Sequence, residues 1–231
     1  MTAQQDAYTG VDNLEVMREA RNYNDWLLRL IGRHAPARGR AIDFGAGSGT
    51  FALPMQRAGL TMTCLEPDAA LSSMLREQGL ATAASLDQLE NESFDFAYSL
   101  NVLEHIDDDA GALRGLHAKL KLGARLLIYV PAFQILYGPM DRKVGHLRRY
   151  RRLDLARRMR DAGFTIETCR YADSLGFFAA LAFRLLKGDS GGDLNPAHIK
   201  LYDRVAFPLS RALDAIAWPL FGKNVIVVAR R

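Results

Sequence analysis

The stretch A-I-D-F-G-A-G-S-G-T-F, residues 41–51, decides the fold of this chain of 231 residues. Its first four residues are mostly apolar, which is typical of a short strand buried in a parallel sheet. The glycines that follow, Gly45, Gly47 and Gly49, predict a tight turn whose bare backbone a ligand can approach closely. Residues 50–58 are then predicted to begin a helix whose free N–H groups face that ligand. The stretch therefore predicts an α/β fold with a ligand at the end of a central strand.

The spacing of these glycines separates two kinds of nucleotide site. A dinucleotide site carries G-x-G-x-x-G. Counting from Gly45 places Thr50 at the third glycine position, and Gly49 comes one residue early. The chain instead has D-x-G-x-G-x-G, beginning at Asp43. This spacing argues against a dehydrogenase.

Three later segments accompany the glycine motif. Residues 61–68, T-M-T-C-L-E-P-D, read as a second strand that ends in an acid. Glu66 lies about twenty residues beyond the glycines, a separation at which a carboxylate can bind both hydroxyls of a ribose. The other two segments are S-F-D-F-A-Y-S-L-N-V-L-E-H-I, residues 93–106, and L-K-L-G-A-R-L-L-I-Y-V-P-A-F, residues 120–133.

Together, the four segments resemble the class I S-adenosylmethionine (SAM) dependent methyltransferases over residues 41–133. The resemblance implies a Rossmann-like α/β fold, a seven-stranded doubly wound sheet with an antiparallel last strand, and SAM as cofactor. Leu122 and Ala124 depart from the family's turn before the fifth strand. The cofactor contacts expected on this basis are Tyr23, Asp43, Gly45, Ala46, Gly47, Glu66, Pro67, Ser85, Leu86 and Asn101.

The resemblance also implies separate roles for several of these cofactor-binding residues. The N–H of Leu86 is expected to hold adenine with Ser85 nearby, although a surface turn explains both residues almost as well. Asn101 follows the fourth strand and is expected near the methionine part of SAM. Tyr23 lies in an N-Y-N-x-W stretch that suggests a helical cap over the pocket. The expected organisation is an N-terminal helical cap, residues 1–36, and a methyltransferase domain, residues 37–231, with a helical insertion and lid at about 174–220.

Glu104 and His105 form an E-H pair that resembles part of a metal-binding motif. In methyltransferases of the ubiquinone-biosynthesis type and in small-RNA 2′-O-methyltransferases, E-x-x-E-H and a distant His bind a divalent cation. This chain has Asn101 where the first acid would be, and an amide oxygen is the weaker ligand for a hard cation. We therefore expect no divalent metal, and we keep both residues as candidate catalytic or substrate-lining groups.

The segment D-R-K-V-G-H-L-R-R-Y, residues 141–150, narrows the resemblance to methyltransferase type 11/12 proteins that carry G-H-x-R-R-Y. A neutral imidazole at His146 can take a proton from an acceptor hydroxyl, and a structural loop histidine is the alternative. Arg148 and Arg149 can hold a carboxylate or phosphate by forked hydrogen bonds. Tyr150 and Phe133 complete the predicted substrate site.

Charge and hydropathy are unevenly distributed. Between residues 142 and 160 there are nine Lys or Arg against one acid, Asp154, which indicates an anionic partner nearby. Residues 174–186 are almost wholly apolar but too short to span a bilayer. They could form a buried helix lining the acceptor pocket, a dimer face, or a segment in peripheral contact with a membrane. The loop-like residues 187–196 are a candidate lid.

These features predict a SAM-dependent O-methyltransferase that acts on a small or lipid-linked acceptor, partly apolar and partly anionic. An RNA methyltransferase is the alternative that the basic run suggests, but an N/D-P-P-Y/F tetrad is lacking and no nucleic acid is expected. A SAM-binding subunit without catalysis is disfavoured by retention of Asp43, Glu66 and the glycines. We expect a cytoplasmic protein, because the first residues lack the basic start and the apolar run of an export signal. We expect it to be a monomer or a homodimer.

Overall fold

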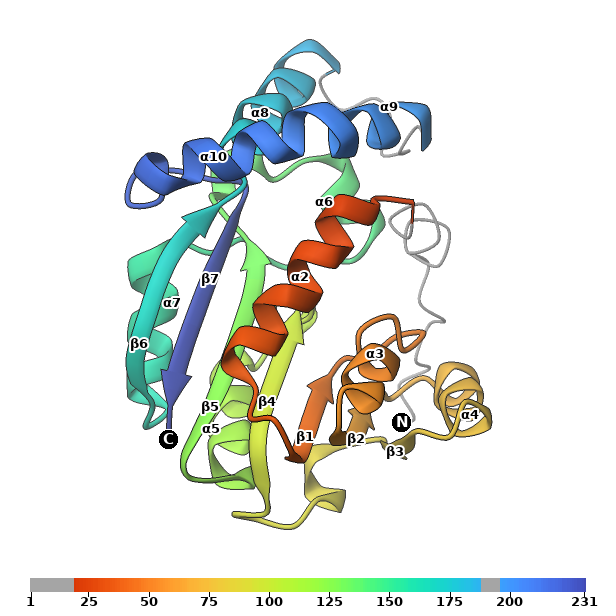
Figure 1. Ribbon diagram of the computed structural model, residues 1–231. Coiled ribbons are helices and arrows are strands. Elements are labelled where there is room, and N and C mark those ends of the chain that lie inside the picture. Colours follow the sequence, from red (N-terminus) through yellow and green to blue (C-terminus); the bar gives the residue numbers. More distant parts are fainter. Residues whose placement is uncertain (1–18, 188–195) are drawn as a thin grey trace, which may run out of the picture.

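The computed structural model describes residues 19–187 and 196–231. In these residues one sheet of seven strands has the order β3-β2-β1-β4-β5-β7-β6 (Figure 1). All neighbouring strands are parallel except β7, which is antiparallel to β5 and β6. The strands are β1 (Gly39–Phe44), β2 (Leu60–Leu65), β3 (Ala81–Ala83), β4 (Phe94–Leu100), β5 (Leu120–Pro131), β6 (Thr165–Ala172) and β7 (Asn224–Arg230). The predicted doubly wound sheet with an antiparallel last strand is confirmed.

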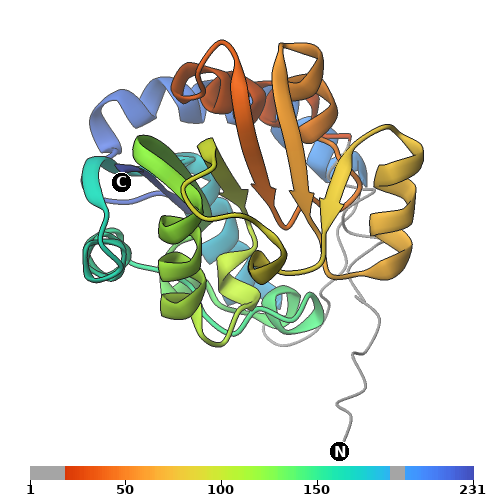
Figure 2. The ribbon, with the colours of Figure 1, turned by 90° about the horizontal axis from the view of Figure 1, so that it is seen from below.

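Helices cover both faces of the sheet because alternate strand residues are apolar on both sides (Figures 1 and 2). Helices α5 (Asp109–Lys119) and α7 (Arg152–Asp161) pack on one face. Helices α2 (Arg21–His34), α3 (Ala52–Arg57) and α4 (Ala69–Glu77) contribute to the core on the other. In β5, for example, Ile128 belongs to the first core and Tyr129 to the second.

The glycine loop is fixed to the neighbouring strand. Phe44 pairs with Leu65 at the carboxyl ends of β1 and β2, and the N–H of Gly45 donates to the Leu65 carbonyl at 2.9 Å. Gly45 and Gly47 have φ of 81° and 53°, in the region that favours glycine. The loop and the residues after β2 therefore lie side by side at one edge of the sheet.

A helical insertion separates β6 from β7 and consists of α8 (Ser174–Lys187), α9 (Pro196–Leu201), the π-helical turn η4 (Tyr202–Ala206) and α10 (Phe207–Ala217). Buried acids anchor it. Asp214 accepts from the N–H of Ser174 at 2.9 Å, and Asp173 accepts from the Ser210 hydroxyl at 2.8 Å. Asp203 accepts from the N–H groups of Asn22 and Tyr23 at 2.9 Å each, so the insertion caps the first turn of α2.

Two sequence expectations can be compared with this arrangement only in part. The predicted helical cap is described from α2 onward, and residues 1–18 lie outside the described residues, as do residues 188–195 of the candidate lid. The apolar helix α8 packs against α10 but exposes Phe178 and Phe183, so it is not the buried, pocket-lining helix considered above. Among the described helices, none combines the length and the apolar composition needed to cross a membrane.

Candidate active site

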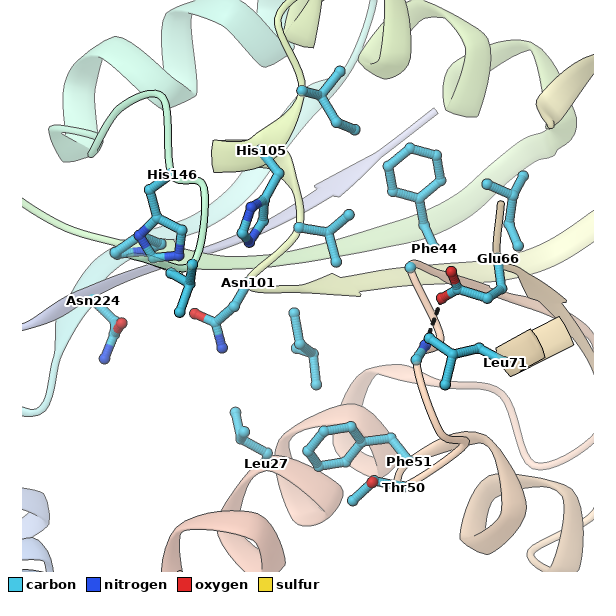
Figure 3. A pocket seen from close by; sticks show the side chains of 18 of the residues that line it. Leu27, Phe44, Thr50, Phe51, Glu66, Leu71, Asn101, His105, His146 and Asn224 are labelled. Atoms are coloured by element: carbon cyan, nitrogen blue, oxygen red, sulfur yellow. Dashed lines mark hydrogen bonds between the residues drawn. The ribbon is translucent and has the colours of Figure 1, made fainter. Parts of the chain in front are cut away.

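A cavity of about 910 Å³ opens at the carboxyl ends of β1, β2 and β4, beneath α2 (Figure 3). Its volume is near the top of the range of about 300–1,000 Å³ for small-molecule sites, so it has room for two ligands. One end is formed by the glycine loop and Glu66. The other end contains Asn101, His105, His146 and Asn224. Open α/β sheets bind ligands at this edge.

Glu66 lies at the first end and is held by backbone donors. Its Oε2 accepts from the N–H of Gly47 at 2.8 Å, and its Oε1 accepts from the N–H of Asp68 at 3.1 Å. Burial raises the pKa of the Glu66 carboxyl, and these two N–H groups partly offset the increase. Each carboxylate oxygen keeps a further lone pair, so the group can accept two hydroxyls of a ligand.

The two loop glycines are required for different reasons. A Cβ on Gly45 would fall 2.3 Å from Cγ2 of Val102, because the loop packs tightly on the segment after β4. A Cβ on Gly47 would meet no protein atom within 4 Å, because this position faces the cavity. The missing Cβ at Gly47 therefore leaves room for a ligand, whereas the missing Cβ at Gly45 leaves room for the side chain of Val102.

Asn101 follows β4 and projects its amide into the cavity (Figure 3). Its N–H donates to the Tyr129 carbonyl at 2.7 Å, and its φ is 54°. Asn tolerates this left-handed conformation better than most residues, and such positions cluster at functional sites. The turn directs the next residues, the short 3-10 helix η2 (Leu103–His105), along the cavity wall.

His146 is oriented by an acid. Its Nδ1 lies 2.6 Å from Oδ1 of Asp141, whose carboxylate also receives both arms of Arg149, at 2.8 and 3.0 Å. Burial alone would raise the pKa of Asp141, but the hydrogen bonds from His146 and Arg149 outweigh it and hold the pKa below its ordinary value. Because an ionised carboxylate only accepts, the neutral form of the ring carries its proton at Nδ1 and has its lone pair at Nε2.

Glu104 is fully buried behind the two histidines. Its Oε1 lies 3.7 Å from Nε2 of His146, and neither carboxyl oxygen has a hydrogen-bond partner among the described residues. Burial raises the pKa of Glu104 to about 8. His105 stands beside His146, with ring centroids 4.7 Å apart, and burial together with the neighbouring His146 lowers its pKa to about 4. Near neutral pH, Glu104 is therefore mainly protonated and His105 is uncharged.

The same three side chains are arranged so that they could hold a metal ion. Each of the residues Glu104, His105 and His146 offers one ligand atom, and these three atoms lie within 4.8 Å of one another. Binding would require loss of the Glu104 proton, so it would be favoured by higher pH. The sequence-based expectation of no metal stays a prediction.

Comparison with known proteins identifies the family. Residues 15–168 match a family model described as a methyltransferase domain. The chain belongs to this methyltransferase domain family. Uncharacterised proteins of two Mycobacterium tuberculosis strains, CDC 1551 and H37Rv, are 29% identical in an alignment of 133 residues that covers 52% of this chain. The chain spans about half the length of these curated relatives, since the match covers 45% of each.

Solved structures confirm the methyltransferase fold. A Thermotoga maritima protein described as a SAM-dependent methyltransferase, possible histamine N-methyltransferase, superposes with a TM-score of 0.64 at 19% identity, covering 95% of this chain and 94% of that one. A chain from a structure described as a complex between the Haloferax volcanii Trm112 methyltransferase activator and "the putative methyltransferase" gives a TM-score of 0.68 at 14% identity, covering 100% of this chain and 99% of that one. At these identities, the likeness concerns the fold alone.

In this methyltransferase domain, the predicted cofactor residues separate into two groups. Those that line the cavity are Tyr23, Gly45, Gly47, Glu66, Pro67 and Asn101. Asp43 does not, because its carboxylate faces the sheet interior and accepts from the Tyr98 hydroxyl at 2.8 Å. Burial raises the pKa of Asp43 to about 7. Ala46 is likewise buried in the core rather than at the cavity surface.

The expected adenine contact at Ser85 and Leu86 is not placed at the cavity. These residues start the 3-10 helix η1 (Leu86–Gln88), where Ser85 is exposed and Leu86 packs toward Gly115 of α5. The turn after β3 thus directs the Leu86 side chain to the helical layer, which short-range sequence reasoning could not anticipate.

The predicted substrate residues are also divided. Arg149 lines the cavity, whereas Arg148 points outward to Asp107 and Asp109, at 3.3 and 3.1 Å. The predicted substrate contacts of Tyr150 and Phe133 are corrected, because both side chains pack inside the protein. Tyr150 is buried and donates its hydroxyl to Asp109 at 2.9 Å, and Phe133 stacks on Tyr171 with centroids 4.6 Å apart.

The basic run that suggested an anionic partner is partly neutralised within the protein, since four of its arginines form ion pairs with acids of the same chain. Arg148 and Arg158 both bind Asp109, an acid distant in sequence, and Arg157 binds Asp154. The number of basic residues in this segment of the sequence therefore overstated its unpaired positive charge.

The unpredicted cavity residues include three polar side chains, Lys223, Asn224 and Asp141. Lys223 and Asn224 enter from the start of β7, and no local motif marks them. Asp141 stands five residues before His146 in the quoted segment, so an acid able to orient the imidazole was a usable signal. Its partnership with His146 nevertheless depends on the turn of helix α6 (Pro139–Lys143).

Replacing Glu104 by Gln is expected to change the pH dependence of stability. The folded-state pKa of about 8 exceeds the ordinary value of 4.5, so the stability gained by keeping this proton is present below about pH 4.5 and lost as the pH rises through about 8. At pH 8 and above, Glu104→Gln should raise the free energy of unfolding relative to the wild type, on the order of 4 kcal/mol at about 1.4 kcal/mol per pKa unit.

Denaturant unfolding at about pH 5 and about pH 8 measures this difference. Glu90→Gln is the matched control, since Glu90 is exposed and should leave the difference between the two pH values unchanged. Equal pH slopes for wild type and Glu104→Gln would show that Glu104 ionises normally.

Proposed function

We propose that this protein is a SAM-dependent methyltransferase that methylates an oxygen atom of a small or lipid-linked acceptor. The observation that carries the proposal is a single cavity with two chemically distinct ends. One end has the open position at Gly47 beside the carboxylate of Glu66, and the other has an imidazole whose Nε2 lone pair is available. Family membership and the fold shared with SAM-dependent methyltransferases support the same activity.

The first end fits the nucleoside of SAM. Glu66 would accept the two ribose hydroxyls, and the bare backbone of Gly47 would allow the sugar to approach closely. Apolar side chains of Leu71, Val102 and Ile106 line the cavity and would cover the adenine ring. Asn101 would then lie toward the methionine part.

When bound, SAM would supply a methyl group attached to a positively charged sulfur. That positive charge already makes the sulfur a good leaving group. The chain contributes alignment and exclusion of water. His146 would accept the acceptor's hydroxyl proton at Nε2, which would leave the acceptor oxygen free to attack the methyl group while the broken S–C bond leaves its electron pair on sulfur. Asp141, hydrogen-bonded at Nδ1, stabilises the imidazolium that forms, and no metal is required in this scheme.

The acceptor end favours a molecule with an anionic group. Lys223 lines it, and among the described residues no acid forms an ion pair with Lys223, whereas Arg149 is paired with Asp141. The buried amide of Asn224 adds a hydrogen-bonding group, and Met140 and Val144 add apolar surface. A carboxylate or phosphate on a partly apolar acceptor would match this set.

Isothermal titration with S-adenosylhomocysteine tests the proposal directly. Wild-type protein is expected to bind it, and Glu66→Gln is expected to bind at least about tenfold more weakly, because one charged acceptor of two hydroxyls is lost. Glu77→Gln, an exposed substitution on α4, should bind like wild type. A flat titration of correctly folded wild-type protein would rule the proposal out.

The two alternatives receive less support. The RNA methyltransferase alternative rested on the basic run, and four arginines of that run form ion pairs with acids of the same chain. A binding subunit without catalysis gives no reason for an oriented His146 at the cavity surface.

A further inference from the structure

The outer side of the insertion carries a continuous apolar stripe. Along α9, η4 and α10, exposed apolar side chains recur every three or four residues, which places them on one helical face. The stripe consists of Leu201, Val205, Leu209, Ala212, Ile216 and Leu220. The opposite face, with Phe207, Ser210 and Asp214, is buried. Nothing in the described residues covers the stripe.

Helix α8 also carries exposed apolar side chains. It packs beside α10 at the end of the molecule where β4 and β5 finish (Figure 1), and it exposes Phe178, Phe183 and Leu185. Of the thirteen large apolar side chains exposed in the described residues, nine belong to the insertion. We call these nine the insertion face: Phe178, Phe183, Leu185, Leu201, Val205, Leu209, Ile216, Trp218 and Leu220. Such a concentration exceeds the scattered exposure that is normal on a soluble protein.

The exposed charges of the described insertion residues are positive. The two acids of the described insertion residues, Asp203 and Asp214, are buried and point inward to their partners. The exposed charged side chains of the described insertion residues are basic: Arg184, Lys200 and Arg204. Lys200 forms an ion pair with Glu19 at 3.1 Å, so Arg184 and Arg204 carry the positive charge that no acid of the described residues pairs with. An apolar surface with such cations at its border is complementary to an apolar layer with an anionic boundary.

We propose that the insertion face docks onto the surface of an anionic lipid bilayer. The apolar side chains would enter the boundary between head groups and acyl chains, while the long basic side chains reach the lipid phosphates. A second copy of this chain is the competing occupant. Two-fold pairing through this face would place like patches together, including their cations, with no exposed acid of the described insertion to neutralise them.

This inference goes beyond the proposed function, and it has a consequence for it. The insertion is hydrogen-bonded to α2 through Asp203, and α2 lines the cavity with Tyr23 and Leu27. Docking would therefore hold the cavity end of the protein at the membrane, where a lipid-linked acceptor is concentrated.

Vesicle sedimentation of the full chain tests the docking. We expect binding to vesicles of phosphatidylcholine with phosphatidylglycerol, weak binding to phosphatidylcholine alone, and loss of binding as salt increases. The double variant Leu209→Asp/Ile216→Asp should bind roughly tenfold more weakly or worse, because both apolar side chains are removed and two anions are added. Arg204→Gln should weaken binding about fivefold through loss of one cation.

The matched control is Leu122→Asp/Leu153→Asp, which makes the same charge change at two exposed leucines outside the insertion face and should leave binding almost unchanged. Three results would overturn the proposal: no binding to anionic vesicles, equal binding to both vesicle types, or a wild-type dimer that Leu209→Asp/Ile216→Asp converts to a monomer in light scattering. Titration of the same samples with S-adenosylhomocysteine reports on the proposed function separately, because vesicle binding does not require the cofactor.

Discussion

Gly47→Ala is expected to weaken S-adenosylhomocysteine binding roughly 100-fold, about 2.7 kcal/mol, while the protein remains folded. The added methyl group would meet no protein atom within 4 Å, so its only steric conflict is with the ligand in the cavity. At a φ of 53° the alanine would be strained, which should lower the free energy of unfolding by about 1 kcal/mol, a loss that a folded domain tolerates. Isothermal titration and thermal unfolding measure the two effects separately.

Two other glycines serve as controls for this prediction. Gly123→Ala introduces the same kind of backbone strain, at φ of 82°, where no atom lies within 4 Å of the new Cβ and no ligand is expected. It should lower stability slightly and leave binding intact. Gly45→Ala should instead lower the free energy of unfolding by about 2 kcal/mol or more, because its Cβ overlaps Val102. Unchanged binding in Gly47→Ala would place the cofactor elsewhere.

The fold was predictable because its signals are local. Short stretches of sequence predict the buried parallel strands and their turns: the apolar run before Gly45, the acid that ends the second strand, and the apolar fifth strand. The sheet order then follows from the family resemblance. Cavity residues on the glycine loop and at the ends of β2 and β4 were predictable for the same reason.

The acceptor side was predicted less well, because its composition depends on long-range packing. Arg148 and Tyr150 stand in the same motif as His146, yet both are bound to Asp109 on α5. Lys223 enters the cavity from the antiparallel last strand, almost the whole chain away from the glycine loop. A motif gives the residue types, but only the turn geometry decides which of them face a ligand.

Replacing His146 by Gln is expected to lower kcat by roughly 10²–10⁴-fold and to leave S-adenosylhomocysteine affinity unchanged. Gln can hydrogen-bond but cannot accept the acceptor's proton. Asp141→Asn should give a loss of similar size, because an amide can donate to Nδ1 and thereby move the imidazole proton to Nε2, the atom that must accept. Transfer of a radiolabelled methyl group from SAM, with a panel of hydroxylated carboxylic acids and lipid phosphates, measures kcat.

His34→Gln, at the end of α2 and away from the cavity, is the matched histidine control and should retain full turnover. The cluster of Glu104, His105 and His146 makes a metal assay part of the same experiment. If His146 acts as a base, EDTA should leave wild-type turnover unchanged. Turnover that EDTA abolishes and a divalent cation restores would show that His146 is a metal ligand instead. Equal loss of cofactor affinity in His146→Gln and Gly47→Ala would contradict the separation of the two ends, since only Gly47 lies against the proposed nucleoside site.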